Sequence, residues 1–143
     1  MLIKLDTRNI AHQKFSYLLQ KERYEYATTN IPHLTPEPVP TFIDHLNYLK
    51  LRPHKHYYVY MENYTYKGII YLNHNNEICI FIARKHLGQG CGEKCVEEFL
   101  KIVERDPNIK ELIATVGINN TPSNNLFKRL GFDYVANLYG ITL

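Results

Sequence analysis

The feature that most constrains the fold is a change of hydrophobic period around three glycines at alternate positions, Gly88, Gly90 and Gly92. Before them, residues 77–83 are rich in isoleucine and phenylalanine, which favours a strand. After them, apolar residues recur at helical spacing over residues 95–103. Glycine lets backbone N–H groups approach a ligand, and a helix N-terminus offers unpaired N–H donors with partial positive charge. The pattern predicts a pyrophosphate-binding loop, with an ordinary glycine-rich turn as the alternative.

Two other phosphate-binding loops do not fit this stretch. A Walker loop needs a Gly-Lys-Ser/Thr ending, which is missing here. A dinucleotide-binding loop needs Gly-x-Gly-x-x-Gly near the start of a parallel βαβ unit, and Gly88 and Gly90 do not supply that register. Moreover, the glycines follow three predicted strands in succession, so both alternatives are disfavoured.

The rest of the chain alternates between the two periods, and its 143 residues suit one α/β domain over residues 1–143. We expect the order β-α-α-β-β-β-α-β-α-β. The proline-rich residues 31–40 are expected to form a loop. The predicted strands cover residues 2–5, 56–61, 67–72, 77–83, 111–118 and 134–143. The predicted helices cover residues 9–23, the stretch from the Thr41 cap to Pro53, the apolar stripe at 95–103, and residues 122–130 before Gly131. The expected apolar stripes are Ile10, Phe15, Leu18 and Leu19 in the first helix and Phe42, Ile43, Leu46 and Leu49 in the second.

Two motifs in this order resemble the GCN5-related N-acetyltransferase family. Residues 87–92, Leu-Gly-Gln-Gly-Cys-Gly, resemble its coenzyme A loop, Arg/Gln-x-x-Gly-x-Gly/Ala, with Leu87 departing at the first position. Residues 116–132 are similar to the family's strand, Asn, helix and Leu-Tyr-x-x-x-Gly-Phe ending. The resemblance implies a mixed, mostly antiparallel sheet of six to seven strands with about four helices. It also implies a sheet splayed between residues 77–83 and 111–118, with acetyl-coenzyme A in the gap.

The resemblance assigns roles to particular residues. Backbone N–H groups of Phe81 and Ile82 would bind the pantetheine arm and the reacting carbonyl. Asn120 would hydrogen-bond the coenzyme arm, although an Asn before Thr-Pro can equally cap a helix. The remaining coenzyme-binding positions implied by the two motifs are Leu87, Gly88, Gln89, Gly90, Cys91, Gly92, Glu93, Ser123 and Phe127.

Catalytic groups follow less directly. Glu77 stands where the family often keeps a base, with an exposed strand-end Glu as the alternative. It shares one predicted strand face with Cys79 and Phe81. Phe127 replaces a Tyr that many members use to protonate the leaving thiolate, so water, Tyr139 or an unprotonated thiolate would have to serve. Cys79 as a nucleophile is disfavoured, because no activating group is placed beside it by the sequence.

The function implied is acetyl transfer from acetyl-coenzyme A to a primary amine by direct attack. A small molecule such as an amino sugar, a polyamine or an antibiotic ranks first, and His54 and His56 are candidates to line its site. A protein N-terminus or lysine, a catalytically silent coenzyme-binding module and a structural domain remain alternatives. The mild charge of +3 and scattered basic pairs argue against a nucleic-acid partner, and we expect no metal and no membrane association. Three cysteines without metal spacing suggest a cytoplasmic setting, and the resemblance leaves room for a homodimer.

Overall fold

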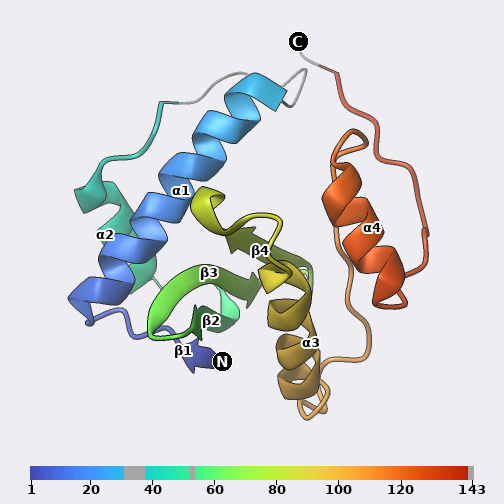
Figure 1. The fold of residues 1–143 in the computed structure, drawn as a ribbon, viewed down its shortest axis with the longest axis horizontal. Coiled ribbons are helices and arrows are strands. Elements are labelled where there is room, and N and C mark those ends of the chain that lie inside the picture. Colours follow the sequence, from blue (N-terminus) through green and yellow to red (C-terminus); the bar gives the residue numbers. More distant parts are fainter. Residues whose placement is uncertain (31–37, 52–53, 142–143) are drawn as a thin grey trace.

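The computed structural model describes residues 1–30, 38–51 and 54–141, with only the backbone described for residues 26–30. The expected proline loop therefore lies partly outside the described residues. Four strands form one antiparallel sheet in the order β1-β2-β3-β4 (Figure 1). Their bounds are β1 Leu2–Lys4, β2 Lys55–Glu62, β3 Thr65–Leu72 and β4 Ile78–Ile82. This confirms the predicted succession of three antiparallel strands before the glycine loop.

Four α-helices accompany the sheet in the described part of the chain, at α1 Ile10–Asn30, α2 Phe42–Lys50, α3 Cys91–Val103 and α4 Thr121–Arg129. The first of them runs past the predicted end at residue 23, because no glycine or proline interrupts the sequence before Pro32. Thr41 caps α2 as predicted, and a reciprocal bond from the Thr41 N–H to the Asp44 carboxylate completes a capping box.

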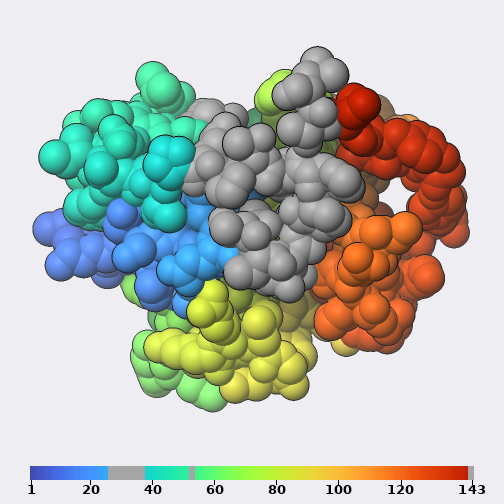
Figure 2. Space-filling model, turned by 90° about the horizontal axis from the view of Figure 1, so that it is seen from above, coloured from blue at the N-terminus to red at the C-terminus, as the bar shows by residue number. Residues whose placement is uncertain are grey.

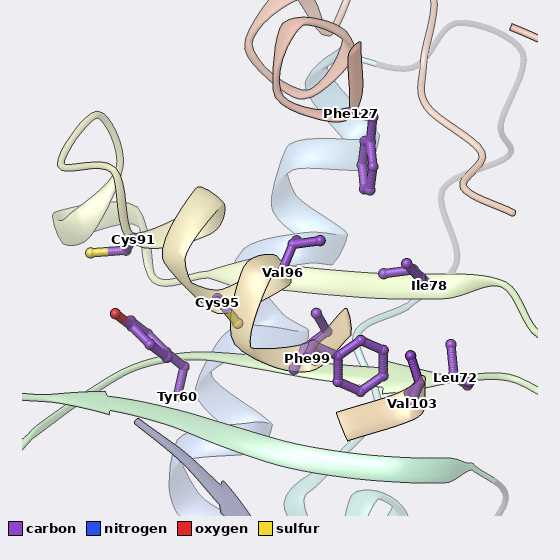
Figure 3. Packing of buried hydrophobic residues seen from close by; sticks show 10 residues of the cluster. Tyr60, Leu72, Ile78, Cys91, Cys95, Val96, Phe99, Val103 and Phe127 are labelled. Atoms are coloured by element: carbon purple, nitrogen blue, oxygen red, sulfur yellow. The ribbon is translucent and has the colours of Figure 1, made fainter. Parts of the chain in front are cut away.

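Alternate strand residues face two separate cores. On one face, Leu19 of α1 and Leu49 of α2 pack against Val59, Ile69 and Tyr71. On the other face, α3 packs against β2, β3 and β4. In that second core Phe99 and Val103 of α3 lie against the strands, and Phe127 reaches in from α4 (Figure 3). The sheet is therefore covered by α1 and α2 on one side and by α3 on the other.

The buried stripe of α1 differs from the predicted one. Ile10 and Leu18 are exposed, whereas His12, Ser16 and Leu19 are buried. In α2, likewise, Ile43 is exposed and His45 is buried. The prediction from apolar residues alone therefore placed the buried stripe of each helix part of a turn away from where it lies. The helices bury polar side chains between them because those side chains find partners there, as Ser16 and His45 do with each other.

The two predicted C-terminal strands are not formed as such in the described residues. Residues 111–118 make a single parallel bridge, Glu77 with Ile113, although their exposure alternates as in a strand. Residues 134–141 are exposed throughout and have no ladder partner in the part of the chain that the structure describes. In Figure 2 this C-terminal segment arches away from α4 and leaves an opening beside it. A strand needs a hydrogen-bonded neighbour, which β-propensity in the sequence does not supply.

Candidate active site

The glycine loop leads from the end of β4 into α3 and leaves a row of backbone donors free. Gly88 and Gly90 have φ of 75° and 74°, a left-handed conformation that glycine adopts without steric cost. A Cβ at either position would meet nothing within 4 Å, so the space above the loop is open. The N–H groups of residues 88–93 donate to no backbone acceptor in the described chain, and α3 has no side-chain cap at Gly90. This arrangement has the geometry of the anion-binding loop that the sequence predicts.

Three further elements frame this loop. A Cβ at Gly92 would lie 3.5 Å from Cδ2 of Leu126 and 3.9 Å from Cγ1 of Ile82, which places the start of α3 against α4 and β4. Glu93, in the first turn of α3, accepts a bond of 3.3 Å from Arg129 at the end of α4. Seen from above, the loop lies between the α1 side and the α4 side of the molecule (Figure 2). The donors of α3 are thus fixed relative to the last residues of β4.

The open edge of β4 supplies two more donors. The N–H of Ile78 donates to the carbonyl of Ile113 at 2.8 Å, and beyond that point the described chain offers β4 no partner on this side. N–H groups alternate in direction along an antiparallel strand, so those of Ile80 and Ile82 also point to the open edge. The N–H of Phe81 points instead toward Ile69 of β3. The N–H expected to be free at Phe81 is therefore used within the sheet, and that of Ile80 points to the open edge instead. The register between the strands decides this direction, and the sequence does not show it.

Several other predicted residues are held in structural roles. Leu87 donates its N–H to the carbonyl of Arg84 within a short turn. The Asn120 side chain accepts from the N–H of Ser123 and so caps α4, which is the alternative interpretation of that residue. Phe127 is buried and packs against the Phe132 ring. In Cys91 only the backbone N–H is available, since its side chain is buried.

The two predicted catalytic side chains lie apart. Glu77 stands at the β3–β4 turn, where its carboxylate accepts a bond of 2.8 Å from Asn73. Tyr139 is 87% exposed in the C-terminal segment, and its hydroxyl is bonded to Asn137 of the same segment. In Figure 1, α4 lies between α1 and that segment. The structure therefore does not bring Tyr139 to Glu77, and burial raises the pKa of the Cys79 thiol, which disfavours a thiolate there.

A small hollow lies on the opposite face of the sheet from α3, between α1, α2 and the strands. Its cavity volume is about 30 Å³, and the wider opening around it, open solvent included, is about 320 Å³. The hollow lies against the face of β4 that carries Phe81. The outward N–H groups of Ile80 and Ile82 lie along the edge of the same strand. The described residues that line it are Ser16, Gln20, Arg23, His45, Tyr48, Tyr57, Ile69, Tyr71 and Phe81. Sequence patterns carry no signal for most of them, because they come from both helices and three strands.

Beside the hollow lies a pair of hydrogen-bonded rings. The Tyr48 hydroxyl bonds to Nε2 of His54, and His54 stacks on Tyr71 with ring centroids 4.0 Å apart. His54 thus lies next to the hollow, whereas the other candidate histidine, His56, bonds to Asp106 at 2.9 Å. Burial, reinforced by the charge of Arg23, lowers the pKa of His54 to about 4, so its ring is neutral near pH 7.

These buried histidines predict a loss of stability in mild acid. Burial lowers the pKa of His12, His45 and His54 below the ordinary value of 6.5, so protons favour the unfolded chain. This stability is present above pH 6.5 and should be lost as pH falls toward about 4. Urea unfolding at roughly pH 7.5, 5.5 and 4.5 spans this window and measures the loss. The variant His54→Gln should show a shallower decline over this range, and an unchanged decline would contradict the assignment to His54.

In the described residues, no group of three or more His, Cys, Asp or Glu side chains is close enough to hold a metal ion. The same part of the chain contains no helix long and apolar enough to cross a bilayer. The binding groups found so far are therefore the backbone donors and the lining of the hollow.

Comparison with known proteins identifies a family and several similar folds. The model of the acetyltransferase (GNAT) family matches residues 16–132. Sequence comparison with curated proteins gives no match. Among solved structures, mutant forms of the spermidine/spermine N-acetyltransferase SpeG of Vibrio cholerae superpose with a TM-score of 0.74 at 20% identity, covering 99% of this chain and 86% of that one. The ribosomal-protein-alanine N-acetyltransferase of Brucella melitensis gives 0.72 at 16% identity, with coverage of 95% and 86%. The putative acetyltransferase YncA of Salmonella typhimurium, solved with its cofactor acetyl-CoA, gives 0.71 at 18% identity, with coverage of 95% and 80%.

Proposed function

The chain belongs to the GNAT family of acetyltransferases, and we propose that it moves an acetyl group from acetyl-coenzyme A to the primary amine of a small molecule. The observation that carries the proposal is the free row of N–H groups at residues 88–93 beside the open edge of β4. Such a row suits a diphosphate, and an open strand edge suits an amide-containing arm. The three free thiols at Cys79, Cys91 and Cys95 fit a reducing, cytoplasmic setting.

The residues present fit the coenzyme. Gly88 and Gly90 leave open the space that a Cβ would enter. The N–H groups of residues 88–93 would hold its diphosphate, and those of Ile80 and Ile82 would donate to the pantetheine amides and the thioester carbonyl. When bound, acetyl-coenzyme A supplies an acetyl group activated as a thioester. Donors fixed by the sheet before binding need no reorganisation as negative charge grows on that carbonyl oxygen.

Titration calorimetry with acetyl-coenzyme A tests the donor, and a thiol-release assay with an amine panel tests the transfer. Tight coenzyme binding with turnover supports the proposal. Tight binding without turnover on any amine favours a silent coenzyme-binding module. The observation behind that alternative is Phe127, which is buried and has no hydroxyl to protonate the leaving thiolate. Absence of binding would exclude both functions.

Glu77 is proposed as the base that takes the ammonium proton of the acceptor through water. Glu77→Gln should lower turnover about 10²-fold, the lower end of what a general base supplies. The loss should be larger at about pH 6 than at about pH 8, because more of the acceptor is then protonated. Coenzyme affinity should be unchanged. The exposed Glu111→Gln is the matched control, and equal rates for Glu77→Gln and the unmodified protein at both pH values would exclude this role.

A further inference from the structure

The hollow between α1 and α2 carries one formal charge among its described lining residues, and that charge is positive. Arg23 reaches the mouth of the hollow from the exposed side of α1, with its guanidinium 4.8 Å from the centre of the Phe81 ring. No carboxylate of the described chain lies within salt-bridge distance of it. The nearby acids are engaged elsewhere, since Glu22 accepts from the N–H of Arg84 and Glu25 pairs with the Arg84 side chain. A guanidinium placed this way is matched to a carboxylate or phosphate.

Two buried hydrogen-bond acceptors in the same lining have no partner in the described chain. One is Oε1 of Gln20, and the other is Nδ1 of His45, a side chain only 2% exposed. The Ser16 hydroxyl lies 3.1 Å from the carbonyl of Gln13, and we assign its proton to that carbonyl. With this assignment Nε2 of His45, 2.8 Å away, donates to the Ser16 hydroxyl. Because burial keeps the His45 pKa low and its ring neutral, Nδ1 retains a lone pair. Leaving buried acceptors unpaired is costly, and an amine offers the N–H donors that would satisfy them.

The remaining lining consists of Ile69 and four aromatic rings. Tyr48, Tyr57, Tyr71 and Phe81 present flat, largely apolar surfaces that would enclose the carbon skeleton of a ligand. The hollow thus offers three kinds of contact at once: acceptors for N–H groups, a cation for an anion, and apolar surface between them.

We propose that this hollow binds an acceptor that carries an anionic oxygen group, a carboxylate or a phosphate, in addition to its primary amine. The inference rests on the proposed acetyl transfer and names its substrate class. The anion binds Arg23, and the amine N–H groups bind Gln20 and His45. A polyamine, the substrate named for the Vibrio cholerae neighbour, is a poor match because its charges would face Arg23 without a carboxylate in the described lining.

Matched pairs of amines test the proposal. With acetyl-coenzyme A saturating, 4-aminobutyrate is compared with butylamine, and phosphoethanolamine with ethanolamine, while spermidine serves as the polycation. The first pair reports on a carboxylate and the second on a phosphate. At least one anionic amine should exceed its neutral partner in kcat/KM by roughly 10- to 100-fold, the range for a charge-assisted hydrogen bond. Arg23→Gln should remove that preference, mostly through KM, and leave coenzyme affinity unchanged.

Further variants separate charge from folding. Arg23→Lys should retain part of the preference, because it keeps the charge and loses the planar fork. Arg8→Gln, at an exposed arginine paired with Asp6, is the matched control and should change nothing. If neutral amines or spermidine turn over as well as the anionic ones, the inference fails while the acetyltransferase proposal stands. If nothing turns over, calorimetry of the coenzyme-loaded protein with 4-aminobutyrate and phosphoethanolamine decides: binding lost in Arg23→Gln supports the anion site, and no binding overturns it.

Discussion

Replacing Gly90 by glutamate should abolish acetyl-coenzyme A binding, with affinity falling by at least about 10²-fold, because two effects add at this position. A side chain would enter the open space in front of the free N–H groups, where the diphosphate is expected, and its carboxylate would repel that diphosphate. The left-handed φ of 74° also costs any non-glycine residue about 1–2 kcal/mol. Titration calorimetry with acetyl-coenzyme A measures the affinity, and circular dichroism checks that the fold is retained.

Two control variants divide these effects. Gly90→Ala carries the backbone cost and a Cβ without the charge, so it should lose stability and lose less affinity than Gly90→Glu. Gly140→Glu makes the same charge change in the exposed C-terminal segment, where a Cβ also meets nothing within 4 Å, and should bind normally. If Gly90→Glu binds as tightly as Gly140→Glu, the free N–H groups at residues 88–93 do not hold the diphosphate.

Local patterns in the sequence predicted the elements that depend on local interactions. The alternation in residues 77–83 predicts the strand, and the glycines after it predict the loop. The helical spacing that follows predicts α3. The Thr41 cap likewise determines the start of α2, because capping involves residues three apart. Residues 111–118 also have the alternation of a strand, yet they pair only at Ile113 in the described chain. Their ladder depends on which segment lies beside them, and no local pattern encodes that.

The part of the candidate site that consists of backbone N–H groups was partly predictable from the sequence. The glycine loop was located because glycine marks a special backbone conformation. The outward direction of the Ile80 N–H was not predicted, because the direction of each N–H depends on the register between β3 and β4. The hollow was missed for another reason: Gln20, Arg23 and His45 lie on two helices and are ordinary surface residue types. Only their convergence on the rings of the sheet makes them a candidate site.

The register between β3 and β4 is itself supported by Gly68, and replacing it should disturb both stability and binding. Gly68 lies opposite Ile82, and a Cβ there would lie 2.6 Å from Cδ1 of Ile82 and 2.7 Å from the carbonyl oxygen of Phe81. The Ile82 side chain can turn away, but the carbonyl cannot move without straining the β3–β4 ladder. Gly68→Ala should therefore lower the free energy of unfolding by about 1–3 kcal/mol, as overpacking does. It should also weaken acetyl-coenzyme A binding, because the displaced segment carries the Ile82 donor.

The double variant Gly68→Ala with Ile82→Val identifies which contact dominates. Valine lacks Cδ1, so the clash with the Ile82 side chain is removed while the clash with the Phe81 carbonyl stays. Urea unfolding of the two single variants and the double variant gives the coupling between the positions. We expect partial recovery of stability and little recovery of coenzyme affinity. Full recovery of both would show that side-chain crowding, rather than the approach of the two backbones, makes glycine necessary where β4 ends and the binding loop begins.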